Sequence, residues 1–432
     1  MKSKEPTVSF EAWNEAVGLV HRWLERSERL DDLMERALPG KTGVERSRLQ
    51  SLVYSVIRQH IRLENKLAGR MSHAPRHRVQ AILYVAGAEL IEAANGSEGE
   101  GLVAKIVHHA VERSKTLISP AEIGLVNAVL RKLGAELQAE TPPPALAPSA
   151  KLADFFSHPE WLVRRWLAQF GAAATRALLE WNQQPADVYA RWRAREGTVP
   201  EWLIPSKWES FYTLTPGHWR EVEALIASGH LYVQDPSTRL AVDLLGLKSG
   251  ETVLDLCAAP GGKSVMMADR MGEGQIVAVD LPGQRQDRLR QNLGRVRGVE
   301  SFIVLADVAR ALAACLKHDQ LPLEYSAVLL DAPCSNTGVM RHRVDVKERL
   351  REDDFLRHPR QQLELLMAAA RQVAPGGRLV YSTCSIDPEE NEGVIQAFLK
   401  KRGDAFELEA RTLSMPWESG HDGAAAFLLR RR

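Results

Sequence analysis

Apolar residues recur at helical spacing through the first third of the chain. Trp13, Val17 and Val20 follow one another at intervals of three or four positions, and the pattern continues to about Leu137. Such a period places the apolar side chains on one face of each helix, where they can pack together. The sequence therefore predicts an all-helical domain over residues 1–140.

A proline-rich stretch ends this pattern and separates the helical domain from the rest of the chain. Residues 142–144 are three consecutive prolines, which lack amide donors and favour an extended backbone. We therefore expect a linker over residues 141–152. Beyond it, a short helix beginning near residue 158 and a strand over residues 188–195 predict a small mixed α/β module over residues 153–235.

Short apolar segments alternate with helical segments after residue 250. The apolar segments are predicted to be strands over residues 252–256, 276–279, 302–305, 327–330 and 378–381. Such alternation is typical of a mostly parallel, doubly wound sheet, whose ligand sites lie at the carboxyl ends of the strands. The expected fold class is therefore α/β: a Rossmann-like sheet over residues 236–432, preceded by the small mixed module and the all-helical domain.

Composition narrows the choice of partner and compartment. The 432 residues contain 56 Lys and Arg against 55 Asp and Glu, so any nucleic-acid surface has to be a local patch. The four cysteines form no CxxC pair and are too few for a disulfide scaffold, which suits a reducing compartment. No apolar run approaches the roughly 20 residues of a membrane helix, and the polar start lacks a signal-peptide pattern. We expect a cytoplasmic monomer with no membrane partner.

A glycine-containing loop follows the first predicted strand and leads directly into a helix. It reads Cys-Ala-Ala-Pro-Gly-Gly-Lys over residues 257–263. Its small residues let the backbone approach a ligand closely, and the amino terminus of the helix presents free amides. A nucleoside triphosphate loop needs glycine where Cys257 stands, five residues before Gly262, and a GxGxxG pattern is absent. The loop therefore favours a nucleoside-bearing cofactor of another kind.

Two aspartates close the second and third predicted strands. Asp280 lies about 20 residues beyond the glycine turn, where a carboxylate can accept hydrogen bonds from both hydroxyls of a ribose. Asp307 is placed in the same way, where it can accept a hydrogen bond from an adenine amino group. The alternative for each residue is a cap on the following helix. The presence of both after a glycine loop favours cofactor binding.

Two cysteines follow the fourth and fifth predicted strands. Cys334 lies in Asp-Ala-Pro-Cys-Ser and Cys384 in Ser-Thr-Cys-Ser, each flanked by small polar residues. A lone cysteine is usually a small buried hydrophobe, but two cysteines at equivalent strand ends face the same cleft and favour thiol chemistry. Cys257 and Cys315 lack such a pairing and are assigned structural roles. No metal is expected, because no further ligands occur at the usual spacing.

These motifs resemble those of the RNA 5-methylcytosine methyltransferase family, which includes the RsmB-type enzymes. The resemblance rests on CAAPGGK at residues 257–263, DAPCS at residues 331–335, and STCS with PEENE at residues 382–392. It implies that S-adenosylmethionine is the cofactor, that Cys384 is the nucleophile and that Cys334 assists release of the methylated product. It also implies that Asp331 contacts both the cytosine and the cofactor. The other cofactor-binding residues implied by the resemblance are Cys257, Ala258, Ala259, Pro260, Gly261, Gly262, Lys263, Asp280 and Asp307.

Thiol chemistry suits methylation at carbon 5 of cytosine. That carbon is a poor nucleophile until another nucleophile adds to carbon 6, and a thiolate is the protein group best suited to this addition. The thiol needs local activation, because free cysteine has a pKa of about 8.5. An acid near ring nitrogen 3, such as Asp331, stabilises the adduct.

The resemblance also bears on the domains and on the substrate. The all-helical domain resembles the NusB-type RNA-binding module of RsmB-type enzymes, and the family relationship implies 16S ribosomal RNA as the substrate. Two segments depart from the family pattern. Asn336 stands where glycine or alanine is usual, and Arg191-Trp192-Arg193 stands where Arg-Val-Asn is expected. These changes leave the residues of the proposed chemistry intact. They bear on whether the RNA target is the same as that of the family.

Basic residues cluster in two places that suit RNA binding, one of them in the small module. The first cluster is a row spaced four apart on one helix face: Arg58, Arg62, Lys66 and Arg70. The second combines charge with aromatic stacking: Arg191, Trp192, Arg193 and Arg195. A basic row is often only a solvated helix face. Phosphate contacts supply most of the non-specific affinity of a protein for nucleic acid. In a chain whose other motifs resemble those of an RNA enzyme, we therefore favour an RNA-binding surface over a merely solvated face.

Functions other than cytosine-5 methylation of ribosomal RNA remain open. The same chemistry serves a transfer RNA cytosine-5 methyltransferase. A non-catalytic RNA-binding ribosome assembly factor is disfavoured by the combination of Cys384, Cys334 and Asp331, for which a scaffold has no use. A DNA cytosine methyltransferase normally places its single nucleophile in a Pro-Cys loop after the fourth strand, so the Ser-Thr-Cys-Ser cysteine disfavours it.

Overall fold

The computed structural model describes residues 5–26, 28–71, 73–96, 100–194 and 197–432. The chain divides into two units. The helical unit comprises Met1–Pro185 and Arg341–Arg349, and the sheet unit comprises Ala186–Met340 and Leu350–Arg432. No helix in the described stretches is both long and apolar enough to cross a membrane.

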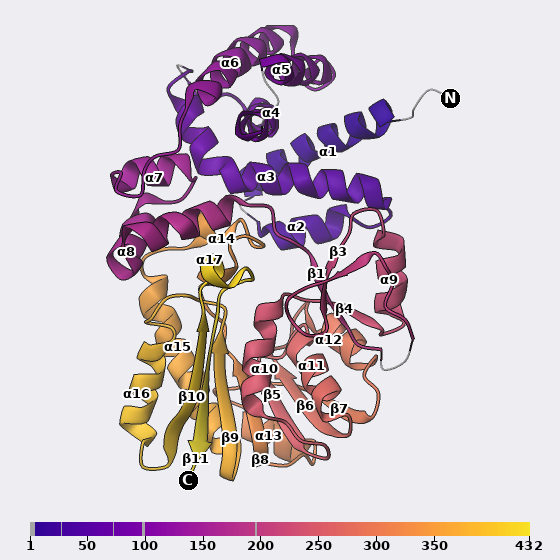
Figure 1. The fold of residues 1–432 in the computed structure, drawn as a ribbon, viewed down its shortest axis with the longest axis vertical. Coiled ribbons are helices and arrows are strands. Elements are labelled where there is room, and N and C mark those ends of the chain that lie inside the picture. Colours follow the sequence, from indigo (N-terminus) through magenta and orange to yellow (C-terminus); the bar gives the residue numbers. More distant parts are fainter. Residues whose placement is uncertain (1–4, 27, 72, 97–99, 195–196) are drawn as a thin grey trace. The chain divides into compact units, whose positions relative to one another are not determined.

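The helical unit consists of helices joined by short connections (Figure 1). The residues whose spacing predicts helices, among them Trp13, Val17 and Val20, are fully buried in one core. The first third of the chain is all-helical, as the apolar period predicts. The helices of this unit are α1 (Glu5–Arg26), α2 (Leu30–Ala37), α3 (Gly43–Ala68), α4 (His77–Asn95), α5 (Glu100–Ser114), α6 (Pro120–Ala139), α7 (Ser149–Phe155), α8 (Glu160–Gln183) and α14 (Val346–Arg349).

The helices after the proline-rich stretch extend the helical unit beyond the predicted boundary. Helix α7 begins inside the expected linker, and α8 spans 24 residues where only a short helix is expected. Both belong to the helical unit and not to the small module. Leu152, Leu162 and Trp166 are fully buried in these helices. Periodicity identifies the helices, but it does not tell which core they join.

A short segment from the later part of the chain, residues 341–349, also belongs to the helical unit. Val344 is buried in the helical core. The Lys347 ammonium donates hydrogen bonds to the carbonyl oxygens of Arg58 and Ser157, and burial lowers the pKa of Lys347 to about 7. The sequence pattern places this segment in the Rossmann-like domain, because so short a stretch shows no periodicity of its own.

The basic row on α3 is not an exposed surface. Arg58, Arg62 and Lys66 retain only 8%, 4% and 8% of their accessible surface. The row pairs with acidic residues of α6 and its end: Arg62 and Lys66 with Glu140, and Lys66 and Arg70 with Glu136. An RNA-binding role of this face stays a prediction, and the burial of the row disfavours it. The spacing of four identifies one side of the helix correctly, but that side packs inside the unit.

We expect Glu140→Ala to destabilise the helical unit. Glu140 lies 2.7 Å from Arg62 and 3.0 Å from Lys66, whose side chains are only 5% and 7% exposed. Removing one partner of a buried pair leaves charge uncompensated, and because Glu140 is itself partly exposed we expect a loss of about 1–3 kcal/mol in the free energy of unfolding. Urea denaturation followed by circular dichroism measures this loss.

The matched control is Glu180→Ala, which breaks an exposed i,i+4 pair with Arg176 on α8. Such pairs stabilise a helix by less than about 0.5 kcal/mol. Equal losses for Glu140→Ala and Glu180→Ala would contradict a stabilising role for the buried row.

The sheet unit begins with a small antiparallel sheet in the order β2–β3–β1–β4. Its elements are β1 (Tyr189–Trp192), β2 (Leu203–Pro205), β3 (Phe211–Leu214), α9 (Trp219–Ala227) and β4 (Leu231–Val233). Arg191 and Arg193 bind Asp269 of α11 (Gly262–Met271) at 2.6 and 2.8 Å, with side chains only 8% and 5% exposed. They are buried ion-pair partners, which disfavours the second predicted RNA surface, and that surface stays a prediction. Arg195 lies outside the described residues.

A seven-stranded sheet forms the centre of the sheet unit, in the order β10–β11–β9–β8–β5–β6–β7 (Figure 1). Its strands are β5 (Thr252–Leu256), β6 (Gly274–Asp280), β7 (Val299–Leu305), β8 (Tyr325–Asp331), β9 (Val373–Thr383), β10 (Phe406–Ser414) and β11 (Ala424–Arg431). Strands β5 to β9 are parallel, and β11 pairs antiparallel with β9 and β10. Each of the five predicted strands lies within an observed one, which confirms the Rossmann-like fold class. The antiparallel strands β10 and β11 were not predicted.

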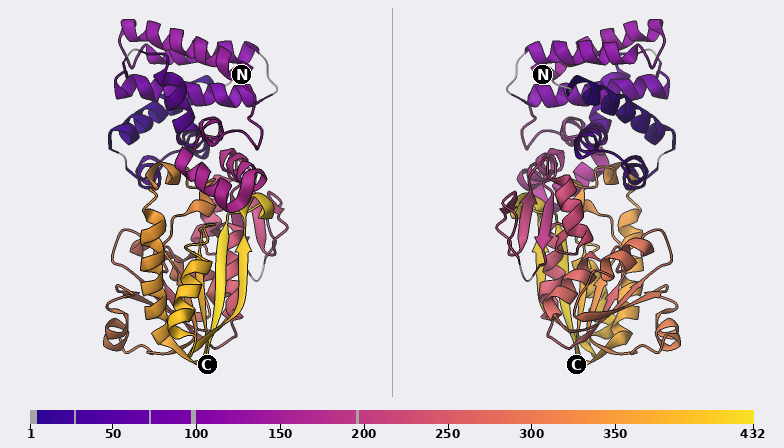
Figure 2. Two further views of the ribbon diagram at one scale, coloured as in Figure 1. Left: turned by 90° about the vertical axis from the view of Figure 1, so that its left-hand side faces the viewer. Right: turned by 90° about the vertical axis from the view of Figure 1, so that its right-hand side faces the viewer.

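Helices cover both faces of this sheet (Figure 2). Alternate strand residues turn to opposite faces. Leu254 packs in a core with α13, α15 and α16, whereas its neighbour Val253 packs in a core with α10, α11 and α12. Because both faces are buried, the central strands are mostly apolar. The helices after β4 are α10 (Arg239–Leu245), α11, α12 (Gln286–Leu293), α13 (Leu312–His318), α15 (Asp354–Ala369), α16 (Glu392–Arg402) and α17 (Pro416–Ser419).

The carboxyl ends of β5, β8 and β9 bring three loops of interest to one edge of the sheet. These strands are neighbours, with Leu256 in register with Leu330 and Asp331 in register with Ser382. The glycine loop follows β5, and the loops that carry Cys334 and Cys384 follow β8 and β9. The topology therefore assembles a single candidate site from three distant parts of the sequence.

Candidate active site

The glycine loop over residues 257–263 leaves no room for side chains at its two glycines. Gly261 has a φ of +100°, and a Cβ atom there would lie 2.9 Å from Cδ1 of Leu289. A Cβ atom on Gly262 would lie 3.0 Å from Nε2 of Gln234. Helix α11 begins at Gly262, so its first free amides lie in this loop. The loop is a close-packed backbone cradle of the kind that a nucleoside cofactor requires.

Asp280 and Asp307 bind backbone amides at the ends of β6 and β7. The Asp280 carboxylate accepts hydrogen bonds from the amides of Ala259 at 2.8 Å and Leu281 at 2.7 Å. Asp307 accepts from the amide of Ala309 at 2.9 Å, within the turn that follows β7. Both side chains are partly exposed, and each carboxylate oxygen has a further lone pair. The helices that follow, α12 and α13, begin at Gln286 and Leu312 without a side-chain cap, so neither aspartate has the helix-capping role considered as its alternative.

Cys334 and Cys384 lie next to each other at the ends of adjacent strands. Their Sγ atoms are 3.3 Å apart, and both are free thiols. The hydrogen bond to Cys384, together with burial, raises the pKa of Cys334 well above its ordinary value. Cys334 therefore keeps its proton at neutral pH. The structure brings together the two cysteines that the sequence analysis pairs.

The other two cysteines pack as apolar side chains. Cys257 and Cys315 lie against the core on the α13, α15 and α16 face of the sheet. Burial raises the pKa of the Cys257 thiol, which disfavours its ionisation. Their packing agrees with the structural roles expected for them.

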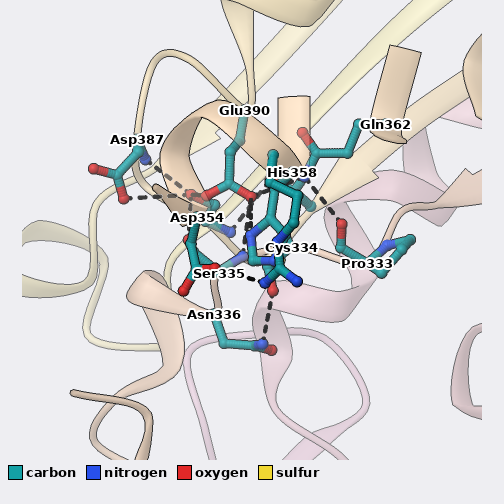
Figure 3. Close-up of polar contacts among 12 residues, drawn as sticks. Pro333, Cys334, Ser335, Asn336, Asp354, His358, Gln362, Asp387 and Glu390 are labelled. Carbon is teal, nitrogen blue, oxygen red and sulfur yellow. Dashed lines mark hydrogen bonds and ion pairs between the residues drawn. The ribbon is translucent and has the colours of Figure 1, made fainter. Parts of the chain in front are cut away.

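Asn336 links the two cysteine loops, and Figure 3 shows its contact with Cys334. Its side-chain Nδ2 donates a hydrogen bond to the carbonyl oxygen of Cys334 at 2.9 Å, and its Oδ1 accepts one from the thiol of Cys384 at 3.2 Å. Asn336 has a φ of +62°, in the left-handed region that asparagine tolerates better than most residues. The residue that departs from the family pattern therefore touches the Cys384 thiol directly.

Asp331, the last residue of β8, forms an ion pair with Lys263. The carboxylate lies 2.6 Å from the ammonium of Lys263 and accepts a hydrogen bond from the Ser382 hydroxyl at 2.8 Å. Burial alone would lower the pKa of Lys263, but the Asp331 carboxylate raises it above its ordinary value, with a smaller contribution from Cys384. Sequence reasoning assigned Lys263 only to cofactor binding. The signal in the sequence for the contact with Asp331 was the position of Lys263 at the end of the glycine loop.

The PEENE segment, residues 388–392, folds back onto the Cys384 loop. The Thr383 hydroxyl donates to Oδ1 of Asn391 at 2.6 Å, and the Asn391 amide donates to the carbonyl oxygen of Ser385 at 3.0 Å. Glu390 is fully buried and accepts hydrogen bonds from both cysteine loops. Sequence reasoning used this segment only as part of a motif and gave Glu390 no role. The signal was a run of acidic residues directly after a reactive loop.

Comparison with known proteins identifies the family. Residues 242–424 match the family described as 16S rRNA methyltransferase RsmB/F, and residues 16–135 match the NusB family. Ribosomal RNA small subunit methyltransferase B of Salmonella arizonae is 30% identical over 431 residues, which covers 95% of this chain and 94% of that protein. The protein of the same name from Vibrio cholerae is 32% identical and covers 83% of this chain and 82% of its own length.

Solved structures share the fold. The crystal structure of PH0851 superposes with a TM-score of 0.74 at 23% identity and covers 100% of both chains. That of a methyltransferase homolog protein from Pyrococcus horikoshii has a TM-score of 0.56 at 24% identity and covers 66% of this chain and 100% of that one. These structures support the fold, and the sequence relatives establish the family. The chain therefore belongs to the RsmB/F family of 16S rRNA methyltransferases and carries an amino-terminal NusB-family region.

Proposed function

We propose that this protein transfers a methyl group from S-adenosylmethionine to carbon 5 of a cytosine in 16S ribosomal RNA, through a covalent bond between Cys384 and carbon 6. The observation that carries the proposal is the pair of thiols 3.3 Å apart beside the Lys263–Asp331 ion pair. Methylation of a nitrogen or oxygen atom does not require a protein nucleophile, whereas carbon 5 of a pyrimidine does. The choice of ribosomal RNA rests on the relatives, which are ribosomal RNA small subunit methyltransferases.

The glycine loop and the two aspartates suit a nucleoside cofactor. Gly261 and Gly262 pack closely against Leu289 and Gln234, and α11 begins at Gly262, so its first free amides lie in this loop. Asp280 and Asp307 retain acceptor capacity at neighbouring strand ends. When bound, S-adenosylmethionine supplies an electrophilic methyl group. The residues proposed to hold it are Cys257, Ala258, Ala259, Pro260, Gly261, Gly262, Lys263, Asp280, Asp307 and Asp331.

Cys384 is the proposed nucleophile. Its Sγ bonds to carbon 6 while the electron pair of the ring double bond moves toward nitrogen 3. The thiol proton of Cys384 leaves to solvent, and the Lys263–Asp331 pair delivers a proton to nitrogen 3, which neutralises the developing charge. Carbon 5 then has the nucleophilic character that methylation requires.

Cys334 is the proposed base for product release. After its own thiol proton has left to solvent, the Cys334 thiolate takes the proton from carbon 5. The electrons of that bond re-form the double bond between carbons 5 and 6, the bond between carbon 6 and Cys384 breaks with its electrons on sulfur, and nitrogen 3 returns its proton to the Lys263–Asp331 pair. In the resting protein the hydrogen bond to Cys384 holds the proton on Cys334. Once Cys384 is bonded to carbon 6, it no longer accepts that hydrogen bond as a thiolate. Cys334 is then able to give up its proton and act as a base.

The target cytosine has to be unpaired or flipped out of its helix to reach Cys384. The residues first expected to bind RNA are engaged inside the protein: Arg58, Arg62, Lys66, Arg70, Arg191 and Arg193. Their ion pairs and burial favour structural roles. We therefore propose that phosphate contacts come from other basic side chains of the chain.

Bisulfite sequencing of ribosomal and transfer RNA from cells with and without the gene tests the proposed function. We expect one methylcytosine of 16S ribosomal RNA to be lost without the gene. Purified protein with S-adenosylmethionine is expected to restore that mark on the unmethylated small subunit or its RNA. Unchanged methylcytosines in every RNA would contradict the proposal, and a loss confined to transfer RNA would contradict the assigned substrate.

A further inference from the structure

Glu390 connects the two cysteine loops from inside the sheet unit (Figure 3). Its side chain is fully buried. Oε2 accepts a hydrogen bond from the backbone amide of Ser335 at 2.9 Å, and Oε1 accepts one from the hydroxyl of Ser385 at 2.9 Å. Ser335 directly follows Cys334, and Ser385 directly follows Cys384. One carboxylate therefore holds the residue next to each thiol.

Helix α15 supplies the remaining partners of this carboxylate. Gln362 donates from Nε2 to Glu390 at 2.8 Å and to the carbonyl oxygen of Pro333 at 3.0 Å, so the Cys334 loop is held on both sides of the cysteine. His358 lies 3.6 Å from Oε2 of Glu390 (Figure 3). Burial alone would raise the pKa of Glu390, but the neighbouring His358 and the hydrogen bonds from Ser335 and Gln362 lower it below its ordinary value. Glu390 is therefore an ionised carboxylate in the interior.

The other charged and titratable groups around Glu390 do not cancel this charge at the Cys334 side. Asp387, on the same loop, is buried and shares the Ser385 hydroxyl with Glu390. The Tyr381 hydroxyl donates to the backbone carbonyl of Glu390, and burial raises the pKa of that phenol. The negative charge of Glu390 is one of the influences that raise the pKa of Cys334, after its hydrogen bond to Cys384 and its burial.

The two neighbouring thiols therefore stand in opposite electrostatic surroundings. Cys334 belongs to the loop that Glu390 binds. Cys384 interacts with the Lys263 ammonium, whose pKa it helps to raise after the larger influence of Asp331. An anion near a thiol favours its neutral form. The spacing of the motifs does not reveal this asymmetry, because both cysteines follow equivalent strand ends.

We propose that Glu390 is a positioning residue that keeps Cys334 protonated and so leaves the nucleophilic role to Cys384. The nucleophilic role of Cys384 is part of the proposed function, so this inference rests on that function. The geometry behind it is a single buried carboxylate, bonded to the residue after each cysteine and flanked by α15. The proposal thereby assigns a chemical role to one residue of the acidic segment after the Cys384 loop.

The test follows the alkylation of Cys334 by iodoacetamide as a function of pH in full-length protein. Cys384→Ser removes the competing thiol, and peptide mass spectrometry quantifies modification of Cys334. We expect a midpoint well above the value of about 8.5 for free cysteine. In Cys384→Ser with Glu390→Gln, which keeps the size of the side chain and removes its charge, the midpoint is expected to fall by about one unit. Alkylation near neutral pH then becomes about tenfold faster, as a one-unit pKa shift requires.

Two further variants in the Cys384→Ser protein separate charge from shape. Glu389→Gln removes the exposed neighbouring carboxylate and is expected to leave the midpoint unchanged. Glu390→Asp keeps the charge on a shorter side chain and is expected to retain a high midpoint. A midpoint that stays the same in Glu390→Gln would overturn the proposal.

Should Glu390→Gln fail to fold, the Cys384→Ser protein alone decides the question. A midpoint of Cys334 at or below that of free cysteine, with Glu390 intact, would also overturn the proposal. The assay contains neither RNA nor S-adenosylmethionine. Its outcome is therefore independent of whether the protein methylates cytosine, and the failure of one proposal is distinguishable from the failure of the other.

Discussion

We expect Cys384→Ser to lower the rate of methyl transfer by about 10⁴-fold or more, because a serine hydroxyl stays protonated at neutral pH and does not add to carbon 6. The substitution exchanges one sulfur for one oxygen, so the contacts of the loop to Asn336 and Cys334 remain within reach. Transfer of labelled methyl groups from S-adenosylmethionine to unmethylated 16S ribosomal RNA measures the rate. The thermal melting curve of the variant reports whether the protein is still folded.

Cys315→Ser is the matched control for this substitution. Cys315 lies on α13 and packs against the sheet core away from the paired thiols. We expect its methyl transfer rate to stay within about threefold of the wild type, because it contributes to packing and not to the chemistry. A folded Cys384→Ser protein that retained a rate close to that of Cys315→Ser would contradict the covalent mechanism.

Cys334→Ser is expected to trap the reaction after methylation. Without a base to remove the carbon 5 proton, the bond between Cys384 and carbon 6 persists, so a protein–RNA adduct accumulates that survives denaturing electrophoresis. Turnover is expected to fall by about 100-fold or more, which is the usual contribution of a general base. Labelled RNA that migrates with the protein on a denaturing gel measures the adduct.

The double variant Cys334→Ser with Cys384→Ser is the control for the adduct, because it lacks the sulfur that bonds to the base. We expect no adduct with it. Adducts that form with Cys384→Ser but not with Cys334→Ser would exchange the roles of the two cysteines. Their absence from all variants and the wild type, despite methyl transfer, would argue against a covalent path.

The positions of Glu390 and Lys263 bear on these two experiments. Glu390 holds both cysteine loops, and Lys263 pairs with Asp331 beside Cys384. The contribution of each cysteine therefore depends on charged groups far from it in the sequence. A change at Glu390 acts on the ionisation of Cys334, whereas Cys334→Ser removes its proton acceptor altogether.

Local patterns in the sequence determined the main elements of the sheet unit. The five central strands are continuous apolar runs, and such runs arise where both faces of a parallel sheet are buried. The glycine loop and the two cysteine loops were also recognisable, because each depends on residue types within a few positions of a strand end. Strands β10 and β11 were missed. In β10 polar positions such as Glu407 and Glu409 interrupt the apolar pattern at the edge of the sheet, whereas β11 is an apolar run that the sequence analysis did not assign.

Only the tertiary structure decided which charged groups face one another. The spacing of Arg58, Arg62 and Lys66 places them on one helix face, but whether that face meets water or Glu140 depends on how α6 packs. In the same way, the sequence pattern around Arg191 does not show that its side chain faces Asp269. A helical or extended period describes a side chain's direction relative to its own element, and it carries no information on what another element brings against it. The membership of residues 341–349 in the helical unit, the bridge through Asn336 and the buried carboxylate of Glu390 all depend on such contacts between distant parts of the chain.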